Sequence, residues 1–285
     1  MSNLEISRAE RLDQYVVRKQ PGLSRGFATR LIQDGDVLVN GEPQLKAGYK
    51  VRPSDRIKIG FDETKAVIFP DIDIPVIYED DDCVVINKPV GLLTHSKGAF
   101  NPEATVSTWL RSRMQAPKGE RAGIVHRLDR ATGGVMICAK TPGALSKLQK
   151  QFSERKTKKT YIAVVAGTPK ESQALIDMPI ERNPKQPQTF RVGSNGKPAQ
   201  TEYKVLKTNG QLSLLELKPV TGRTHQLRVH LKYLGHPIVG DTLYDGQPAE
   251  RMFLHALSLE ITLPDSQRKT FEAPLPPEFN KLVAA

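Results

Sequence analysis

The sequence is poor in cysteine, with only Cys83 and Cys138 among its 285 residues. Both lie inside apolar runs, and neither belongs to a CxxC pair, so the sequence offers no thiol cluster for zinc and no disulfide framework. We therefore expect both cysteines to be small buried side chains in a protein of a reducing compartment, the cytoplasm.

Long apolar runs are missing as well. No stretch approaches the roughly 18 consecutive apolar residues of a transmembrane helix, and the densest patch, residues 161–167, has only the length of a strand. The first 14 residues carry charges but no apolar core, so we expect no secretory signal there. The sequence predicts a protein that does not associate with membranes.

Signature motifs of the common cofactor and metal chemistries are also absent. The chain contains no GxxxxGK[ST], GxGxxG or GxSxG motif, so the sequence does not indicate a phosphate-binding loop, a dinucleotide-binding fold or a nucleophile elbow. Its six histidines form neither HExxH nor a Cys/His zinc spacing. We expect no cofactor and no metal, and metal-dependent nuclease activity has no support from these motifs.

Positive charge is abundant and unevenly spread. Lysine and arginine total 42 against 31 acidic residues, a formal net charge of +11, which favours polyanionic partners but also occurs in proteins that are basic for solubility alone. Residues 62–82 reverse the sign, with eight acidic side chains against Lys65. Because Pro70 and Pro75 punctuate this stretch, we predict a first domain over residues 1–61, an acidic linker over 62–75 and a second domain over 76–285.

The sequence of the first domain predicts two helices and a small sheet. Apolar residues at helical spacing predict a helix over residues 8–19, and Ser24 is a plausible N-cap for a second helix. Asn40-Gly41 is a strong hairpin signal. Strands are expected at residues 37–39, through 49–51 and at 57–59.

Residues 10–60 resemble the small RNA-binding domain first known from a protein of the small ribosomal subunit, the S-four type. The matching features are S-R-G at 24–26, the helix that follows, Gly35, and V-L-V-N-G at 37–41. The resemblance implies that Arg25 and Arg30 on the second helix contact structured RNA through its shape and phosphates. The alternative is a solvated basic face on a dimerisation module.

From residue 76 onward the chain is rich in strands without a regular alternation of strand and helix. We therefore expect an α+β fold rather than a doubly wound α/β fold. The expected strands are 76–78, 84–86, 135–138, 161–165 and 212–217, and the expected helices are 104–115, 142–153 and 225–234.

A polar cluster at 126–134 (H-R-L-D-R-A-T-G-G) interrupts this pattern. Arg127 and Arg130 flank Asp129 and favour its charged form. An ionised, positioned carboxylate can act as nucleophile or base, or can stabilise positive charge developing at a sugar. On these residues alone, an ordinary solvated ion pair remains the alternative.

The same segment resembles the signature of the pseudouridine synthases that modify large-subunit ribosomal RNA. The likeness spans residues 76–277, and it departs from the usual pattern at Gly133, where the family has Ser or Thr. Further blocks follow in the family's order: I-N-K-P at 86–89 with G-L-L-T-H at 91–95, K-T-Y-I-A at 159–163, T-G-R-T-H-Q-L-R at 221–228, G-H-P-I-V-G-D at 235–241 and F-L-H-A at 253–256.

This resemblance implies a catalytic domain with a central mixed, mainly antiparallel sheet, preceded by a small α/β RNA-binding domain. The implied reaction isomerises uridine to pseudouridine within large-subunit (23S) ribosomal RNA, without a cofactor, by a protein expected to be a monomer. The alternatives are the same isomerisation on transfer RNA, and an RNA-binding or ribosome-assembly factor without catalysis.

The resemblance also assigns roles to individual residues. Asp129 is the expected catalytic carboxylate, either attacking the anomeric carbon or removing a sugar proton. Tyr161 is expected to stack on a uracil flipped out of the RNA, and Arg127 to fill the vacated space or hold the flipped phosphate. Arg228 is expected to hold Asp129 by a bidentate contact. Arg223 is the second choice for pairing with Asp129 and is otherwise expected to contact phosphate or substrate. Lys88 is expected to contact substrate phosphate, with an ordinary strand-end loop as the alternative. His225 and His230 are expected to make structural hydrogen bonds.

Overall fold

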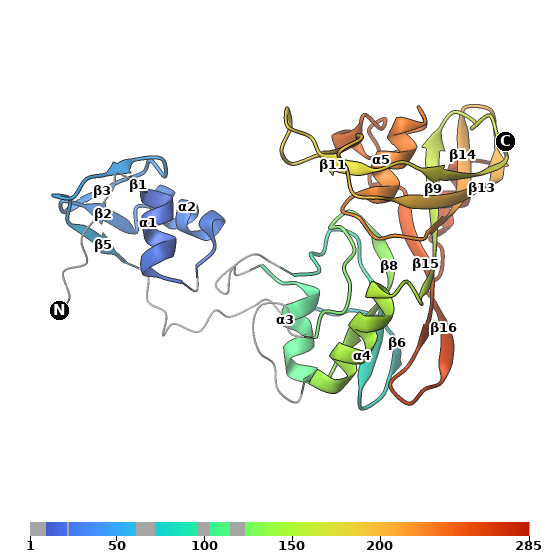
Figure 1. Ribbon diagram of the computed structural model, residues 1–285, viewed down its shortest axis with the longest axis horizontal. Coiled ribbons are helices and arrows are strands. Elements are labelled where there is room, and N and C mark those ends of the chain that lie inside the picture. Colours follow the sequence, from blue (N-terminus) through green and yellow to red (C-terminus); the bar gives the residue numbers. More distant parts are fainter. Residues whose placement is uncertain (1–9, 22, 61–71, 96–102, 115–122, 285) are drawn as a thin grey trace. The chain divides into compact units, whose positions relative to one another are not determined.

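The computed structural model describes residues 10–21, 23–60, 72–95, 103–114 and 123–284, which form two compact units (Figure 1). The expectation about a secretory signal falls largely on residues outside this description, and so does most of the acidic linker expected over 62–75.

The first unit packs two helices against short strands around a core that includes Leu12, Val16 and Ile32. As expected, Ser24 caps the second helix, its Oγ accepting a hydrogen bond from the Phe27 amide at 3.2 Å. Its elements are β1 (Glu10–Arg11), α1 (Leu12–Lys19), α2 (Arg25–Gln33), β2 (Val37–Val39), β3 (Glu42–Pro43), β4 (Lys50–Val51) and β5 (Ile57–Ile59).

The structure differs from one sequence prediction for this unit and confirms another. The first helix begins at Leu12 rather than residue 8, because β1 is extended and pairs with β4. The hairpin is confirmed: Asn40 and Gly41 have φ of 56° and 94°, the left-handed values that a tight turn between β2 and β3 requires.

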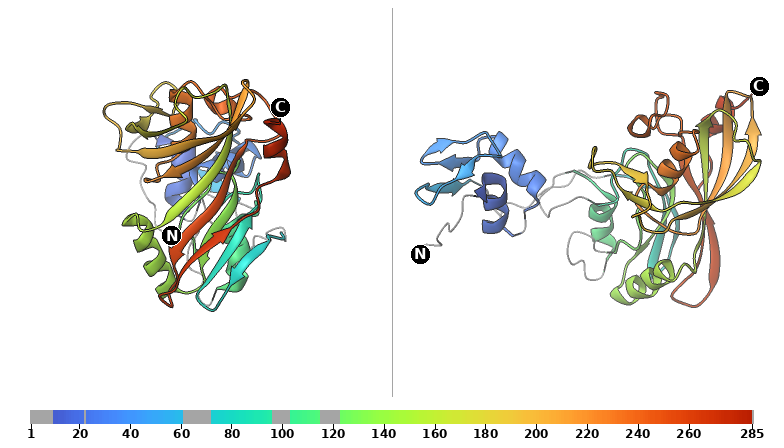
Figure 2. Two further views of the ribbon diagram at one scale, coloured as in Figure 1. Left: turned by 90° about the vertical axis from the view of Figure 1, so that its right-hand side faces the viewer. Right: turned by 45° about the horizontal axis from the view of Figure 1, so that its top comes forward.

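The second unit is built on one sheet of nine strands (Figures 1 and 2). The order is β10-β13-β14-β9-β15-β8-β7-β6, with β16 paired to β15, and only the β8–β15 pair is parallel. The expected α+β class with a mixed, mainly antiparallel sheet is confirmed. The strands are β6 (Val76–Glu79), β7 (Cys83–Lys88), β8 (Gly133–Ala139), β9 (Lys158–Ala166), β10 (Gln173–Asp177), β13 (Gln200–Thr208), β14 (Leu212–Pro219), β15 (Leu254–Thr262) and β16 (Arg268–Glu272).

The remaining elements connect or cover this sheet. The helix expected over 104–115 is shorter than predicted and ends in a 3₁₀ turn, whereas the one expected over 142–153 has those bounds and is capped by Thr141. These elements are α3 (Val106–Leu110), a 3₁₀ turn (Arg111–Arg113), α4 (Pro142–Ser153), α5 (Gln226–Tyr233), a 3₁₀ turn (Thr242–Tyr244), α6 (Pro277–Leu282) and the separate hairpin of β11 (Ile180–Arg182) and β12 (Phe190–Val192).

The central strand β9 separates two apolar clusters. Tyr161 and Ala163 pack in a cluster that contains Leu227 of α5, whereas Ile162 lies in a cluster with Phe279 of α6. Because alternate residues of a strand point to opposite faces, the α5 side of β9 carries residues 159, 161 and 163. That face holds the candidate site.

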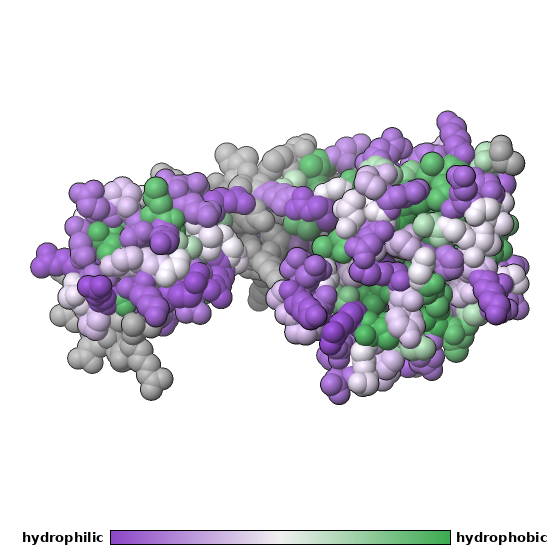
Figure 3. Space-filling view, turned by 90° about the horizontal axis from the view of Figure 1, so that it is seen from above, coloured by the Kyte–Doolittle hydropathy of each residue, from purple (hydrophilic) through white to green (hydrophobic). Residues whose placement is uncertain are grey.

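Cys83 and Cys138 are buried free thiols, as expected, and burial raises the pKa of each to about 12. Within the described part of the chain, no helix combines the length and apolar character needed to cross a bilayer. Figure 3 shows polar side chains over most of the visible face of the first unit.

Candidate active site

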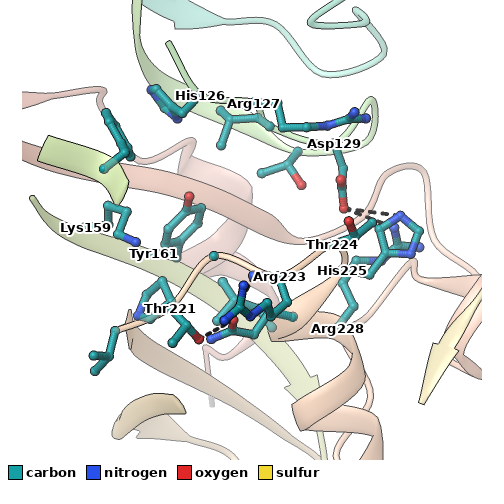
Figure 4. Close-up of a pocket in the computed structure, with 18 of the residues that line it drawn as sticks. His126, Arg127, Asp129, Lys159, Tyr161, Thr221, Arg223, Thr224, His225 and Arg228 are labelled. Carbon is teal, nitrogen blue, oxygen red and sulfur yellow. Dashed lines mark hydrogen bonds and ion pairs between the residues drawn. The ribbon is translucent and has the colours of Figure 1, made fainter. Parts of the chain in front are cut away.

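A pocket of about 450 Å³ opens in the second unit beside β9 (Figure 4). Its lining comes from the loop before β8, the C-terminal end of α4, the start of β9, and the segment from the end of β14 into α5. Five residues selected from the sequence line it together: Arg127, Asp129, Tyr161, Arg223 and Arg228.

The loop that carries Asp129 is anchored by a second loop that follows β7. The Thr94 hydroxyl donates to the Leu128 carbonyl at 2.8 Å and accepts from the Leu128 amide at 3.3 Å. The Gly91 amide donates to the Arg130 carbonyl at 2.8 Å. The backbone is thus fixed on both sides of Asp129, whose side chain remains 21% exposed to the pocket.

Gly133 and Gly134 follow this loop, and a different neighbouring residue accounts for glycine at each position. Gly134 has φ of +114°, and a Cβ there would lie 2.2 Å from the Ala256 carbonyl oxygen of β15, so close pairing of β8 with β15 requires glycine. A Cβ on Gly133 would lie 3.0 Å from Cγ2 of Val90. The departure from the family pattern at Gly133 therefore leaves room for the branched side chain of Val90.

Arg228 joins two carboxylates, and the expected bidentate contact with Asp129 is wrong. Its Nη1 donates a single hydrogen bond to Asp129 Oδ2 at 3.2 Å. The bidentate partner is Asp241, reached from Nε and Nη2 at 2.7 Å each, and the guanidinium also lies over the Tyr244 ring at 4.8 Å. Burial of Arg228 opposes its charge, but both carboxylates outweigh burial and raise its pKa.

His225 belongs to this cluster, although only structural hydrogen bonds were predicted for it. Its Nε2 lies 3.7 Å from Asp129 Oδ2, and its Nδ1 is 2.7 Å from the Tyr244 hydroxyl. The Tyr244 oxygen also accepts from the Phe190 amide at 2.9 Å. Burial lowers the pKa of His225, with Asp129 opposing, so we assign a neutral ring that accepts the Tyr244 proton at Nδ1 and turns its Nε2–H toward Asp129.

His230 has the structural role predicted for it. It is fully buried, and its two ring nitrogens contact the Thr201 hydroxyl at 3.0 Å and the Met178 carbonyl at 2.9 Å. The difference from His225 follows from backbone position, because His225 precedes α5 with a left-handed φ of 56°, whereas His230 lies within the helix.

The segment before α5 is held by the buried side chain of Gln226. Its Oε1 accepts from the Thr221 hydroxyl at 2.6 Å and from the Arg223 amide at 3.0 Å, and its Nε2 donates to the Gln200 carbonyl at 2.8 Å. The half-buried Arg223 side chain donates from Nε to the Pro198 carbonyl at 3.0 Å. Arg223 therefore lines the pocket from a fixed turn.

Tyr161 and Lys159 enter the pocket from the same face of β9. Burial, helped by the charge of Asp129, raises the pKa of Tyr161, so its phenol is neutral at physiological pH. Arg127 lines the pocket with an exposed side chain, whereas Lys159 is half-buried. Sequence reasoning did not assign Lys159, Asp241 or Tyr244 to the site, although the first two stand in blocks that carried the family resemblance.

Lys88 does not occupy the position expected of a substrate contact. Only 1% of the residue is exposed, and its ammonium donates to the carbonyls of Pro89 at 2.9 Å and Leu92 at 2.8 Å. Burial lowers its pKa to about 8, with Asp129 opposing. Lys88 therefore fixes the loop that in turn anchors the Asp129 loop.

Arg25 and Arg30 lie on α2 of the first unit. Arg25 donates from Nε to the buried Asp13 at 2.8 Å, a contact that the sequence did not reveal, and Arg30 is exposed. Burial would raise the pKa of Asp13, but its ion pairs with Arg11 and Arg25 lower it. Among the described residues, no group of three or more His, Cys, Asp or Glu side chains is arranged to hold a metal ion.

Comparison with known proteins identifies both parts of the chain. Residues 82–233 match the family described as RNA pseudouridylate synthase, and residues 10–57 match the S4 domain. The ribosomal large subunit pseudouridine synthase D of Borreliella burgdorferi is 38% identical over 287 residues, covering 95% of this chain and 88% of that protein. The ribosomal large subunit pseudouridine synthase C of Vibrio parahaemolyticus is 31% identical and covers 96% of this chain and 92% of that protein.

Solved structures agree with this relationship. Human RNA pseudouridylate synthase domain containing 1 superposes with a TM-score of 0.60 at 31% identity, covering 73% of this chain and 86% of that one. The human protein named domain containing 4 gives 0.59 at 28% identity, covering 72% and 90%. With an S4 domain ahead of its catalytic sheet, this chain belongs to the RNA pseudouridylate synthase family and is an RNA pseudouridine synthase.

Proposed function

We propose that the enzyme converts uridine to pseudouridine in large-subunit ribosomal RNA, with Asp129 as its catalytic carboxylate. The observation that carries the proposal is the partly exposed carboxylate of Asp129 in the pocket, held by Arg228 at 3.2 Å with Tyr161 in the same lining. The ribosomal substrate is supported by the names of the Borreliella and Vibrio relatives, which match nearly the whole chain.

In the proposed reaction Asp129 acts on the ribose. It either attacks C1′ as a nucleophile or takes a proton from C2′, and both routes require an ionised carboxylate with a fixed direction. Arg228 supplies that direction from one side, and the Nε2–H of His225 faces the same Asp129 oxygen from another. Neither contact occupies the second oxygen, Oδ1, which we assign to the reacting atom.

The target nucleotide has to leave the RNA stack to reach this carboxylate. A pocket of about 450 Å³ has the size of a small-molecule site, so it holds one extruded nucleotide and not a helix. Flipping costs a few kcal/mol, and stacking of the base on the Tyr161 ring returns about 1–3 kcal/mol. We assign Arg127, exposed at the pocket, to the vacated stack or the flipped phosphate, and Arg223 to substrate phosphate.

The S4 domain is proposed to hold folded RNA through phosphate contacts from α2. Arg30 is the better placed of the two arginines for this, because Arg25 is already paired with Asp13. We further propose that the enzyme works as a monomer in the cytoplasm, where ribosomal RNA is made available to it.

The test is pseudouridine mapping of total RNA from cells that lack this protein and are complemented with wild type, Asp129→Asn or Asp245→Asn. Asp245 is a matched control, because its carboxylate pairs with Lys232 on an exposed surface and its left-handed backbone suits asparagine. We expect wild type and Asp245→Asn to restore sites in large-subunit ribosomal RNA, and Asp129→Asn to restore none while still binding the RNA.

Other outcomes contradict specific parts of the proposal. Restoration by Asp129→Asn would remove Asp129 from the chemistry. Restoration confined to transfer RNA would replace the ribosomal substrate. If the wild-type protein restores no site at all, the proposed function is wrong.

A further inference from the structure

Lys159 brings a positive charge into the pocket, and the proposed reaction has so far given this residue no role. It lies two residues before Tyr161 on β9, so both side chains leave the same face of the strand. Figure 4 shows the Lys159 ammonium beside the Tyr161 ring, with the Asp129 carboxylate on the other side of that ring. A base stacked on Tyr161 with its sugar at Asp129 would therefore direct another edge toward Lys159.

The surroundings of Lys159 do not neutralise its charge. Within the described residues, no hydrogen-bond acceptor or carboxylate pairs with the ammonium, and burial lowers its pKa to about 8. The neighbouring His126 cannot serve as an acceptor at Nε2, because that nitrogen already accepts from the Ile137 amide at 3.2 Å. Burial together with the charge of Lys159 lowers the pKa of His126 to about 3, which keeps its ring neutral.

A half-buried cation without a counterion is unfavourable in the free protein and becomes favourable when an anion arrives. Resting on the function proposed above, we propose that Lys159 donates a hydrogen bond to a carbonyl oxygen of the target uracil and stabilises the negative charge of the detached base. The C1′–N1 bond breaks heterolytically on either route, and its electron pair stays on the uracil, where the charge spreads over N1, O2 and O4. Lys159 keeps its proton throughout this step.

The shape of uracil lets one lysine serve both halves of the reaction. A half-turn about the line through N3 and C6 exchanges N1 with C5 and also exchanges O2 with O4. A donor aimed at one carbonyl position therefore meets a carbonyl oxygen before and after the base turns. The pair of electrons on the ring then forms the C5–C1′ bond, while C1′ releases Asp129 on the nucleophile route or C2′ regains its proton from Asp129 on the other route. The C5 proton is lost and N1 gains a proton, so no atom or electron is added.

The experiment is single-turnover conversion of large-subunit ribosomal RNA purified from cells that lack this protein, with binding of the same RNA measured in parallel. The variants are Lys159→Met, which removes the charge, and Lys159→Arg, which keeps it. Lys158→Met is the matched control, because Lys158 is the adjacent residue of β9, points to the other face and pairs with Glu260 at 3.2 Å.

We expect Lys159→Met to lower the rate at saturating RNA by about 100-fold, the loss typical of removing one donor to developing charge, with less than a threefold change in Kd. Lys159→Arg should recover part of the rate, and Lys158→Met should match wild type. An unchanged rate, or a loss confined to Kd with a weaker salt dependence, would overturn the proposal, the latter by making Lys159 a phosphate contact. Failure of the proposed function would show differently, as a wild-type enzyme that converts no uridine.

Discussion

Arg228 gives two of its donor positions to Asp241 and only one to Asp129. The Nε and Nη2 bonds to Asp241 are both 2.7 Å, whereas the Nη1 bond to Asp129 is 3.2 Å. Because a guanidinium is planar and rigid, the bidentate pair fixes its plane and thereby the direction of Nη1. Asp241, which is 2% exposed, thus positions the Asp129 carboxylate through Arg228, and it is not itself part of the pocket lining.

We predict that Asp241→Asn slows single-turnover conversion by about 10- to 100-fold while Kd for RNA changes little. The amide keeps the shape of the carboxylate but loses its charge and one acceptor, so Arg228 can rotate and misdirect Asp129. Thermal melts should show a folded protein. Asp245→Asn is the control that should leave the rate unchanged, and an Asp241→Asn enzyme with the wild-type rate would exclude the positioning role.

The second prediction concerns the hydroxyl of Tyr244. Tyr244→Phe keeps the ring beneath Arg228 but removes the proton that His225 Nδ1 accepts, so the Nε2–H tautomer facing Asp129 is no longer favoured. Losing one hydrogen bond of about 1.4 kcal/mol at the transition state corresponds to a rate about tenfold lower. Single-turnover kinetics with a denaturant titration measures both effects.

His230→Ala is a control that distinguishes an effect on the orientation of His225 from a loss of protein stability. His230→Ala removes two buried hydrogen bonds outside the pocket lining, so it should lower the free energy of unfolding by about 2–3 kcal/mol with a near-normal rate per folded molecule. If Tyr244→Phe behaves like His230→Ala, with lost stability and an unchanged rate, the proposed tautomer has no part in catalysis.

Local signals in the sequence predicted a helix cap, a hairpin turn and the fold class. Ser24 and Asn40-Gly41 specify their cap and turn through backbone chemistry alone, and the α+β class follows from the strand pattern. The bidentate partner of Arg228 could not be predicted in this way, because Asp129 is 99 residues and Asp241 13 residues away, and tertiary packing decides which carboxylate receives two hydrogen bonds.

The other differences between the sequence predictions and the structure concern the burial of two lysines. From the sequence, Lys88 was expected to contact substrate phosphate, yet its side chain is buried and donates to two backbone carbonyls. Sequence periodicity does not distinguish a buried lysine at the end of a strand from an exposed one. Lys159 is the reverse case, since it belongs to the family block at 159–163, in which only Tyr161 was expected to have a role. Its place beside Tyr161 on one face of β9 is a consequence of strand register.

The third prediction addresses RNA binding by the S4 domain. Arg30→Gln should weaken binding of large-subunit ribosomal RNA and reduce the slope of log K against log salt by roughly 1, because one phosphate contact is lost. Arg25→Gln should also leave the buried Asp13 with one ion pair fewer, and so should lower stability as well. An unchanged salt slope for Arg30→Gln would mean that Arg30 does not contact phosphate.

The fourth prediction is a loss of kcat/KM as pH rises through about 8. The pKa of Lys159 is lowered by burial to about 8, so the cation that stabilises the uracil is mostly present at neutral pH and disappears above it, tenfold per pH unit. The pKa values of three other groups in the pocket lining move away from this range: burial lowers those of His126, to about 3, and His225, and it raises that of Tyr161.

Lys88 is a competing group, because burial also lowers its pKa to about 8. Lys159→Arg distinguishes the two lysines, since a guanidinium keeps its proton at this pH. If Lys159 causes the alkaline limb, it disappears in Lys159→Arg and persists in Lys158→Met. If the limb persists in Lys159→Arg, Lys159 is not its source, and the loop that Lys88 holds against Asp129 is the part of the site that fails when its ammonium is deprotonated.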